Sequence, residues 1–129
     1  MEYIALTGIA DSVIEILKKH TLRTLEIRNP QNFLGVLELN PGDSILLTST
    51  SLQDLTDGTS ALIARIVQMQ VSVHSIISSN DLYIEEKEAM SARIQLQCKC
   101  MARIRSVISS DLGKPVKVDA REISCYEAR

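Results

Sequence analysis

The sequence predicts an α+β fold, a small mixed barrel of about five to seven strands with two short helices near the N-terminus. Two observations lead to this prediction. The first part of the chain shows strand, helix, strand, helix and strand patterns in succession. The second part carries long stretches in which apolar and polar residues alternate, and no helical repeat separates them. A doubly wound sheet would need helices between its later strands as well, so we expect a barrel.

Length and composition indicate one small domain, residues 1–129. A hydrophobic content of 45% is enough for a packed core. With one Phe, three Tyr and no Trp, that core must be built from Ile, Leu and Val. The formal net charge of −2 lacks the basic excess of a dedicated duplex binder. Any nucleic-acid contact is therefore expected at a local patch, with a single-stranded segment or a nucleotide.

Three features predict a cytoplasmic protein with reduced thiols and no membrane contact. Residues 1–10 lack the basic start of a secretory signal and carry Glu2 instead. No apolar run approaches the roughly 18–20 residues that cross a bilayer. The three cysteines are an odd number, and Cys98 and Cys100 stand one residue apart, which argues against a secreted disulfide framework.

The first elements follow one another closely. Residues 3–9 are predicted to form a strand, and a helix then begins at Ser12, where Ser12 and Glu15 match a capping box. Basic residues at 18–20 suit the negative end of that helix. Residues 22–28 are predicted to form the next strand.

A second short helix is predicted to follow Asn29 and Pro30, because Asn caps helices and Pro is favoured at their first position. It should end near Glu38, and Gly35 weakens it by about 1 kcal/mol relative to Ala. A tight turn at residues 40–43 leads into a buried strand. That strand covers residues 44–47 and ends in the hydroxyl residues that follow it.

The second half is predicted to be mainly strand. Residues 61–74 form a long candidate, apolar on both faces at first and on one face later. Residues 76–82 are predicted to be a loop, and residues 83–90 are either a short helix or an arm. Residues 92–104 alternate well, and a last short strand begins at 116–118.

Glu26 and Arg28 are the first candidates for a site. They stand two residues apart on a predicted strand, so both side chains point to one face. If that face turns inward, an acid and a base are buried together, which is costly unless they pair or bind a ligand. If it turns outward, they form a surface ion pair.

The motif Thr21, Arg23, Glu26 and Arg28 resembles the Gly-x-Lys-x-x-Glu-x-Arg motif of PUA-like domains of the ASCH class. The turn at residues 41–43 and the strand after it are similar to a second feature of that class. The likeness covers about residues 3–75 and part of 92–104. The chain also resembles an uncharacterised archaeal family of unknown function, chiefly at residues 5–9, 23–28 and 62–65.

The resemblance implies a PUA-like barrel that binds RNA or a nucleotide, in a cleft around Glu26 and Arg28. The expected ligand-binding residues either belong to the motif or are polar residues on the strands after it. They are Arg23, Glu26, Arg28, Thr48, Ser49 and Arg65. A guanidinium suits a phosphate or a base edge, and a carboxylate accepts from an amino group.

Two alternatives remain, one implied by the resemblance and one by the long apolar strand. Some ASCH proteins are amidohydrolases that act on modified cytidine; here Glu26 or Glu88 would handle protons, and Arg23 would stabilise an oxyanion. Arg23 stands where those enzymes use Lys, and an arginine is a poor general base. The other alternative is a non-catalytic assembly subunit, a homodimer in which the apolar strand 63–73 pairs between chains.

Metal and phosphate sites complete the sequence predictions. Cys98 and Cys100 lack partners at tight spacing, because Cys125, His20 and His74 lie far away in sequence, so we expect free thiols and no metal or other cofactor. A basic stripe along one strand either follows a phosphate backbone or is a solvated face. Its members are Arg93, Lys99, Arg103 and Arg105.

Overall fold

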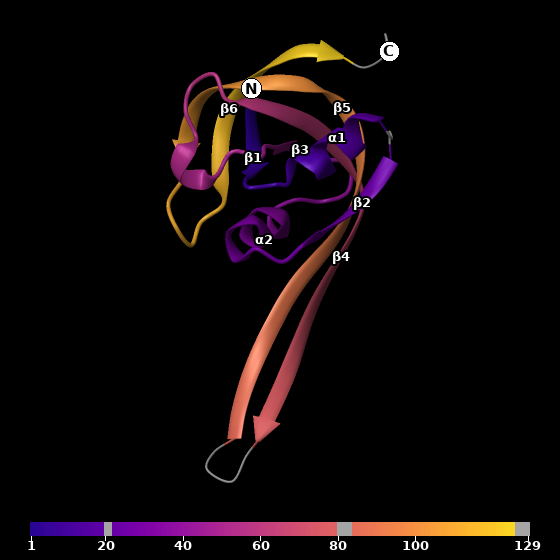
Figure 1. The fold of residues 1–129 in the computed structure, drawn as a ribbon, viewed down its shortest axis with the longest axis vertical. Coiled ribbons are helices and arrows are strands. Elements are labelled where there is room, and N and C mark those ends of the chain that lie inside the picture. Colours follow the sequence, from indigo (N-terminus) through magenta and orange to yellow (C-terminus); the bar gives the residue numbers. More distant parts are fainter. Residues whose placement is uncertain (20–21, 80–83, 126–129) are drawn as a thin grey trace.

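The computed structural model describes residues 1–19, 22–79 and 84–125. Within them the chain forms six strands, two α-helices and one 3-10 turn (Figure 1). In order these are β1 (Glu2–Leu6), α1 (Asp11–Lys19), β2 (Leu22–Ile27), α2 (Pro30–Leu37), β3 (Ser44–Leu47), η1 (Leu52–Asp54), β4 (Ser60–Ser79), β5 (Ile84–Ser109) and β6 (Val116–Cys125). The predicted α+β class, with two short helices near the N-terminus, is confirmed.

The six strands form one sheet in the order β2-β5-β4-β3-β1-β6. β1 and β3 are parallel, and the other neighbours are antiparallel. β5 also pairs with β6, so the pairings of β1, β3, β4, β5 and β6 close into a ring. β2 stays outside this ring and pairs with β5 through Leu22–Ile27.

The core has two parts, one on each face of the sheet. One part receives buried side chains from all five strands of the ring, and Ile63, Cys100 and Val118 belong to it. The other part lies between the sheet and the two helices, where Leu17 and Phe33 pack against Leu96 and its neighbours. Most of these side chains are aliphatic, as the composition requires.

The helix starts agree with the sequence prediction at α2 and differ at α1. Asn29 caps α2, because its side-chain oxygen accepts a hydrogen bond from the Asn32 backbone amide at 3.0 Å, and Pro30 is the first helical residue. α1 begins at Asp11, so the predicted cap Ser12 is already inside the helix. That prediction was wrong because the Val13 and Ile14 amides both find their acceptor on the Ala10 carbonyl, two residues before the expected cap at Ser12.

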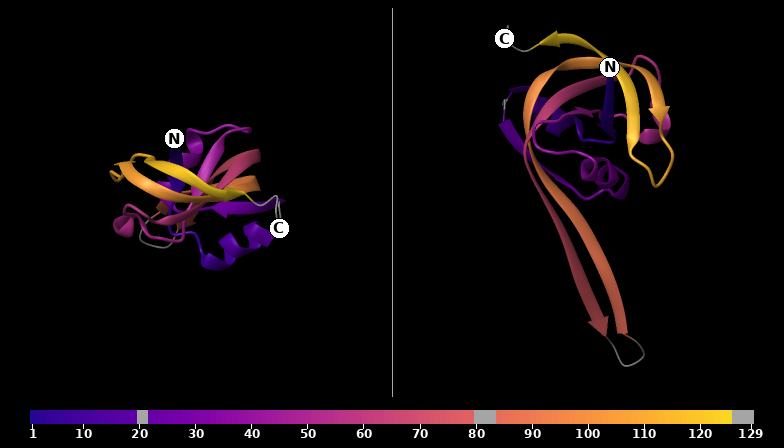
Figure 2. Two further views of the ribbon diagram at one scale, coloured as in Figure 1. Left: turned by 90° about the horizontal axis from the view of Figure 1, so that it is seen from above. Right: turned by 180° about the vertical axis from the view of Figure 1, so that it is seen from behind.

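The longest strands, β4 and β5, form a hairpin that projects from the rest of the molecule (Figures 1 and 2). We call residues 71–79 and 84–91 the arm. The ladder continues to Ser79 and Ile84, so residues 76–79 are strand where the sequence predicts a loop. Residues 84–90 belong to the arm rather than to a helix. Residues 80–82 of the predicted loop, and Tyr83 of the segment 83–90, lie outside the described residues.

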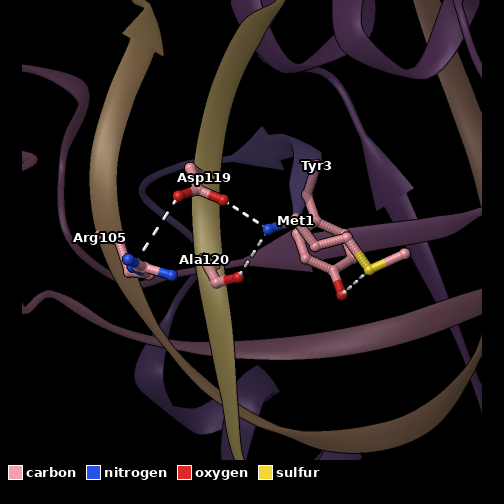
Figure 3. A network of polar contacts seen from close by, with 5 residues as sticks. All are labelled: Met1, Tyr3, Arg105, Asp119 and Ala120. Atoms are coloured by element: carbon pink, nitrogen blue, oxygen red, sulfur yellow. Dashed lines mark hydrogen bonds and ion pairs between the residues drawn. The ribbon is translucent and has the colours of Figure 1, made fainter.

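A polar network ties the first strand to the last (Figure 3). The Met1 ammonium lies 2.5 Å from an Asp119 carboxylate oxygen, and the Ala120 backbone amide donates to the Met1 carbonyl at 2.9 Å. Arg105 Nε lies 3.9 Å from the other Asp119 oxygen. The network joins β1, β5 and β6 where the ring of pairings closes. No helix in the described part of the chain is long and apolar enough to cross a membrane.

Candidate functional site

Glu26 and Arg28 lie on the solvent side of β2. Arg28 Nη2 lies 3.2 Å from Glu26 Oε2, and the two side chains are 77% and 36% exposed. Between them in sequence, Ile27 is buried in the core beneath the helices. The alternation of the strand therefore directs the ion pair outward. Of the two predicted arrangements, a buried pair and a surface ion pair, the structure has the surface ion pair.

Glu26 and Arg28 line one wall of a shallow pocket of about 210 Å³. The opposite wall comes from Gly8, Ile9 and Ala10, which connect β1 to α1. The pocket is also lined by Val13 of α1, by Leu25 and Ile27 of β2, and by Asn29 and Asn32 at the start of α2. Its lining thus combines apolar side chains and two asparagines with the exposed Glu26–Arg28 ion pair.

Asn32 fixes the wall of this pocket from inside the protein. It is buried, its side-chain nitrogen donates to the Thr7 carbonyl at 2.9 Å, and its side-chain oxygen accepts from the Thr7 amide at 3.0 Å. α2 is thereby joined to the end of β1, next to Gly8 and Ile9. Because both polar groups of Asn32 are occupied, it shapes the pocket rather than contacting a ligand.

Polar side chains on β5 and β4 extend the surface that begins at Glu26. In the ladder Glu26 pairs with Arg93, and Arg93 pairs with Gln70. Directly opposed residues share one face of a sheet. The same rule applies to the next two rows of the ladder, which are Thr24, Gln95 and Gln68, and then Leu22, Gln97 and Arg65.

We call the polar members of these rows, with Arg28, the arginine–glutamine face. It comprises Thr24, Glu26, Arg28, Arg65, Gln68, Gln70, Arg93, Gln95 and Gln97. Gln95 is half-buried and the others are exposed. The alternate residues Leu25, Ile66, Ile94 and Leu96 pack in the core beneath the helices, so this face lies on the side of the sheet away from them. It holds three arginines and one carboxylate, a locally basic surface in an acidic chain.

A second shallow pocket, of about 170 Å³, lies within this face. Thr24, Gln68, Gln70, Arg93 and Gln95 line it, together with Met69. Amides, a hydroxyl and a guanidinium offer both hydrogen-bond donors and acceptors, the groups that read base edges. The face therefore suits a polar, planar ligand better than an apolar one.

The structure separates the predicted site residues. Arg65 belongs to the arginine–glutamine face with Glu26 and Arg28. Arg23 points to the other side of β2 and lines a different pocket, of about 100 Å³, against α1. Ser49 is exposed, and its neighbours are hydrogen-bonded to the connection that lines the Glu26 pocket: the Ile9 amide donates to the Thr48 carbonyl at 3.0 Å.

Thr48 does not offer a hydroxyl to a ligand. Its side chain is fully buried, its Oγ1 donates to the Ser60 carbonyl at 2.9 Å, and it accepts from the Thr50 amide at 3.2 Å. The hydroxyl joins β3 to the start of β4 and is structural. The sequence could not show this, because a Thr at the end of a strand is equally typical of a turn and of a ligand site.

The basic stripe along β5 is divided. Arg103 donates to the Gly58 carbonyl at 3.2 Å, and Arg105 faces Asp119, so both make structural contacts. Arg93 belongs to the arginine–glutamine face. Lys99 Nζ lies 3.3 Å from the Ser44 hydroxyl, beside the row that contains Arg65. The sequence revealed the charge and amide alternation of β5 but not its pairing with Glu26, which requires the register of the ladder.

The remaining candidates have little accessible chemistry. Cys98 is half-buried and Cys100 is buried. Burial raises the pKa of the Cys98 thiol, and the positive charge of Lys18 opposes that rise only in part. No group of three or more His, Cys, Asp or Glu side chains among the described residues could hold a metal ion. The side chain of Glu88, the alternative proton-transfer group, lies outside what the structure describes.

Comparisons with known proteins place these features in a family. A family model described as "Protein of unknown function (DUF473)" matches residues 1–118. An uncharacterized protein of Methanocaldococcus jannaschii is 31% identical over 97 residues, which are 75% of this chain and 60% of that protein. The match thus spans less than two thirds of the relative's length. No solved structure matches the chain. The predicted likeness to an uncharacterised archaeal family is confirmed.

Proposed function

Since the chain belongs to the DUF473 family of proteins of unknown function, we propose its function from its own geometry: it is a PUA/ASCH-like module that binds single-stranded RNA or a nucleotide. The ring of pairings through β1, β3, β4, β5 and β6 supports the barrel in this proposal. The ligand contacts the arginine–glutamine face.

The proposal depends on one observation: strand pairing brings a set of hydrogen-bonding side chains together on the arginine–glutamine face. Its three arginines can contact phosphates or guanine edges, and its four glutamines can pair with adenine edges. Glu26 beside Arg28 offers an acceptor and a donor 3.2 Å apart, which matches an amino group beside a carbonyl on a base edge.

The size of the pockets favours single bases. At about 170 and 210 Å³ they are smaller than the clefts of roughly 300–1,000 Å³ that enclose drug-sized ligands. Each therefore accepts one base from an unstacked strand while the sugar and phosphate remain outside. The bases of a duplex are stacked and would not enter.

The charge of the face sets the strength of binding. Three arginines against one carboxylate give a modest attraction that salt weakens, since phosphate contacts release counterions. No Phe, Tyr or Trp occurs on the face, so binding lacks the stacking that strong single-strand binders use. We expect weak affinity with a shallow salt dependence.

The test is binding of short RNA oligomers, measured by fluorescence anisotropy at low salt for the wild type, Arg93→Ala and Arg28→Ala. Loss of one phosphate contact should weaken binding and reduce the salt slope by about 1. Arg121→Ala is the matched control, because Arg121 is exposed on β6, away from the face. The proposal is wrong if the wild type binds no RNA oligomer or nucleotide at low salt, or if Arg121→Ala weakens binding as much as Arg93→Ala.

The amidohydrolase alternative receives no support from the described geometry. With Glu26 as the proton-transfer group, it requires Arg23 and Glu26 to act on one substrate, but they lie on opposite faces of β2 and line different pockets. The Glu26 carboxylate is also exposed and paired with Arg28, so it is not enclosed around a substrate as a general acid or base would be.

A further inference from the structure

The arm carries an apolar surface that faces solvent. Val71, Val73, Ile77 and Met90 are 39%, 58%, 68% and 47% exposed. Val71, Val73 and Ile77 alternate along β4, and Met90 is the ladder partner of Val73, so the four share one face. We call it the apolar arm face.

The apolar arm face continues the protein core beyond the body. Met69 and Ile94 are ladder partners and pack in the core beneath the helices, and the next row is Val71 with Ala92. A two-stranded ribbon without a covered apolar face is only marginally stable in water. β3 pairs with β4 no further than Arg65, and β2 pairs with β5 no further than Ala92, so no described strand flanks the arm. Some other surface must stabilise it.

We propose that a second copy of this chain covers the apolar arm face, in a two-fold dimer in which each arm docks on the partner's α1–β2 groove. That groove is the pocket of about 100 Å³ between α1 and β2. Val13, Ile16, Leu17 and Leu25 give it an apolar lining, and Arg23 stands at its side. Of strand 63–73, only Val71 and Val73 belong to the apolar arm face, because residues 63–65 already pair with both β3 and β5 and Met69 packs in the core.

Charge favours a contact of the arm with the body over a contact between two arms. Residues 71–91 contain four acidic residues and one basic residue, whereas the rest of the chain contains 12 acidic and 13 basic residues. The groove adds a basic margin through Lys19 at the end of α1 and Arg23 on β2, whereas Lys18 is paired with Glu15 at 3.1 Å. Two arms packed together would repel, and an arm on this groove is attracted.

Area favours a second copy over a different protein. At about 3.3 Å per residue, the nine residues 71–79 span roughly 30 Å, about the width of a body of 100 residues. A two-stranded face of that length covers about 300 Å², so one arm contact removes roughly 600 Å² from water. A stable interface needs about 1,200 Å² or more, and reciprocal docking of two arms doubles the area to reach it.

The oligomeric state of the full chain tests the proposal. We expect a dimer by light scattering at micromolar concentration, and a monomer for the double variant Val73→Lys with Met90→Lys. The control is Ser72→Lys with Ser91→Lys, the adjacent ladder row on the opposite face, which adds the same charge and should remain dimeric. Circular dichroism must show the same fold for both. A monomeric wild type, or a Val73/Met90 variant that remains dimeric, overturns the proposal.

Two further measurements test the docking position. Ile16→Lys, which places a charge in the α1–β2 groove and leaves the arm intact, should dissociate the dimer at least tenfold more easily. Salt should weaken the dimer, because opposite charges attract across the interface. A dimer that salt strengthens, or that tolerates Ile16→Lys, would show that the arms pack on each other and that the groove is not the docking site.

Discussion

The guanidinium of Arg28 lies 3.2 Å from the carboxylate of Glu26, and both side chains are open to solvent. Exposed ion pairs contribute about 0–1 kcal/mol to stability. Glu26→Gln should therefore lower the free energy of unfolding by no more than this, measured by urea denaturation. Glu38 directly follows α2, and Glu38→Gln should change the free energy of unfolding equally little. A loss of about 3–5 kcal/mol, expected for a buried pair, would contradict the exposed geometry.

RNA binding separates the same two variants. Because Glu26 belongs to the arginine–glutamine face and Glu38 does not, Glu26→Gln should change affinity for RNA oligomers. Removal of one carboxylate makes the face more basic, so backbone contacts should strengthen while discrimination between bases falls. Equal affinity and equal base preference in both variants would show that Glu26 is an ordinary surface residue.

Asn32 should be the most sensitive polar residue near the site. Asn32→Ala leaves the buried Thr7 amide and carbonyl without their partners, at a cost of about 2–4 kcal/mol. Asn29→Ala removes only the cap of α2 and should cost about 1 kcal/mol. Urea denaturation of both variants gives the comparison, and similar losses would show that the Asn32 bonds are worth no more than a cap.

The fold class could be predicted because its signals are local. Asn29 with Pro30, the turn at residues 40–43 and the alternation around Ile94 each depend on a few neighbouring residues. The arm was predicted only in part, because its polar Ser residues near the tip are as typical of loops as of an exposed strand. Only the continuous ladder between residues 71–79 and 84–92 shows that the hairpin extends so far.

The candidate site could be predicted less well than the fold. Glu26 and Arg28 are two residues apart, so their proximity follows from any strand. Their partnership with Arg93 and Gln70 depends on the register of three strands, including an irregularity between Ile66 and Gln68. Sequence patterns do not fix such a register, because a shift of one residue reverses every side chain. Whether a given polar residue is buried, as Thr48 is, likewise depends on tertiary packing.

Acid should weaken the link between β1 and β6. The hydrogen bond from the Met1 ammonium holds the pKa of Asp119 below its usual range. Burial opposes this lowering, and the charges of that ammonium and of Arg105 add to it. A carboxylate with a lowered pKa stabilises the fold above its ordinary pKa of about 3.9, and this contribution is lost as pH falls below that value. Asp119→Asn should therefore destabilise the protein at neutral pH and matter less at pH about 3.

The measurement is the denaturation midpoint of the wild type and of Asp119→Asn, each at neutral pH and at pH about 3. A second variant with residues added before Met1 displaces the ammonium from Asp119 and should reproduce the effect of Asp119→Asn (Figure 3). A difference between wild type and Asp119→Asn that stays constant with pH would show that the ion pair does not contribute.

Gly35 reverses an expectation based on helix propensity alone. Alanine in place of glycine usually stabilises a helix interior by about 1 kcal/mol. Gly35 is buried where α2 crosses β1, and a Cβ there would lie 2.9 Å from Ile4 Cγ2 and 3.5 Å from Leu6 Cδ2. The Ile4 methyl is attached to the branched Cβ and cannot turn aside without moving the strand. Overpacking of this kind costs about 1–3 kcal/mol, so Gly35→Ala should be neutral or destabilising by up to about 2 kcal/mol.

A double-mutant cycle with Ile4→Ala isolates this contact, because that change removes the methyl against which the new Cβ would press. In the Ile4→Ala background, Gly35→Ala should stabilise the protein, since the helix gains propensity and the added methyl fills part of the space left by Ile4. The sign of the effect of Gly35→Ala should therefore change between the two backgrounds. If Gly35→Ala stabilises the wild type by about 1 kcal/mol, α2 does not approach β1 as closely as the structure shows. The position of α2 at the Glu26 pocket would then be wrong as well.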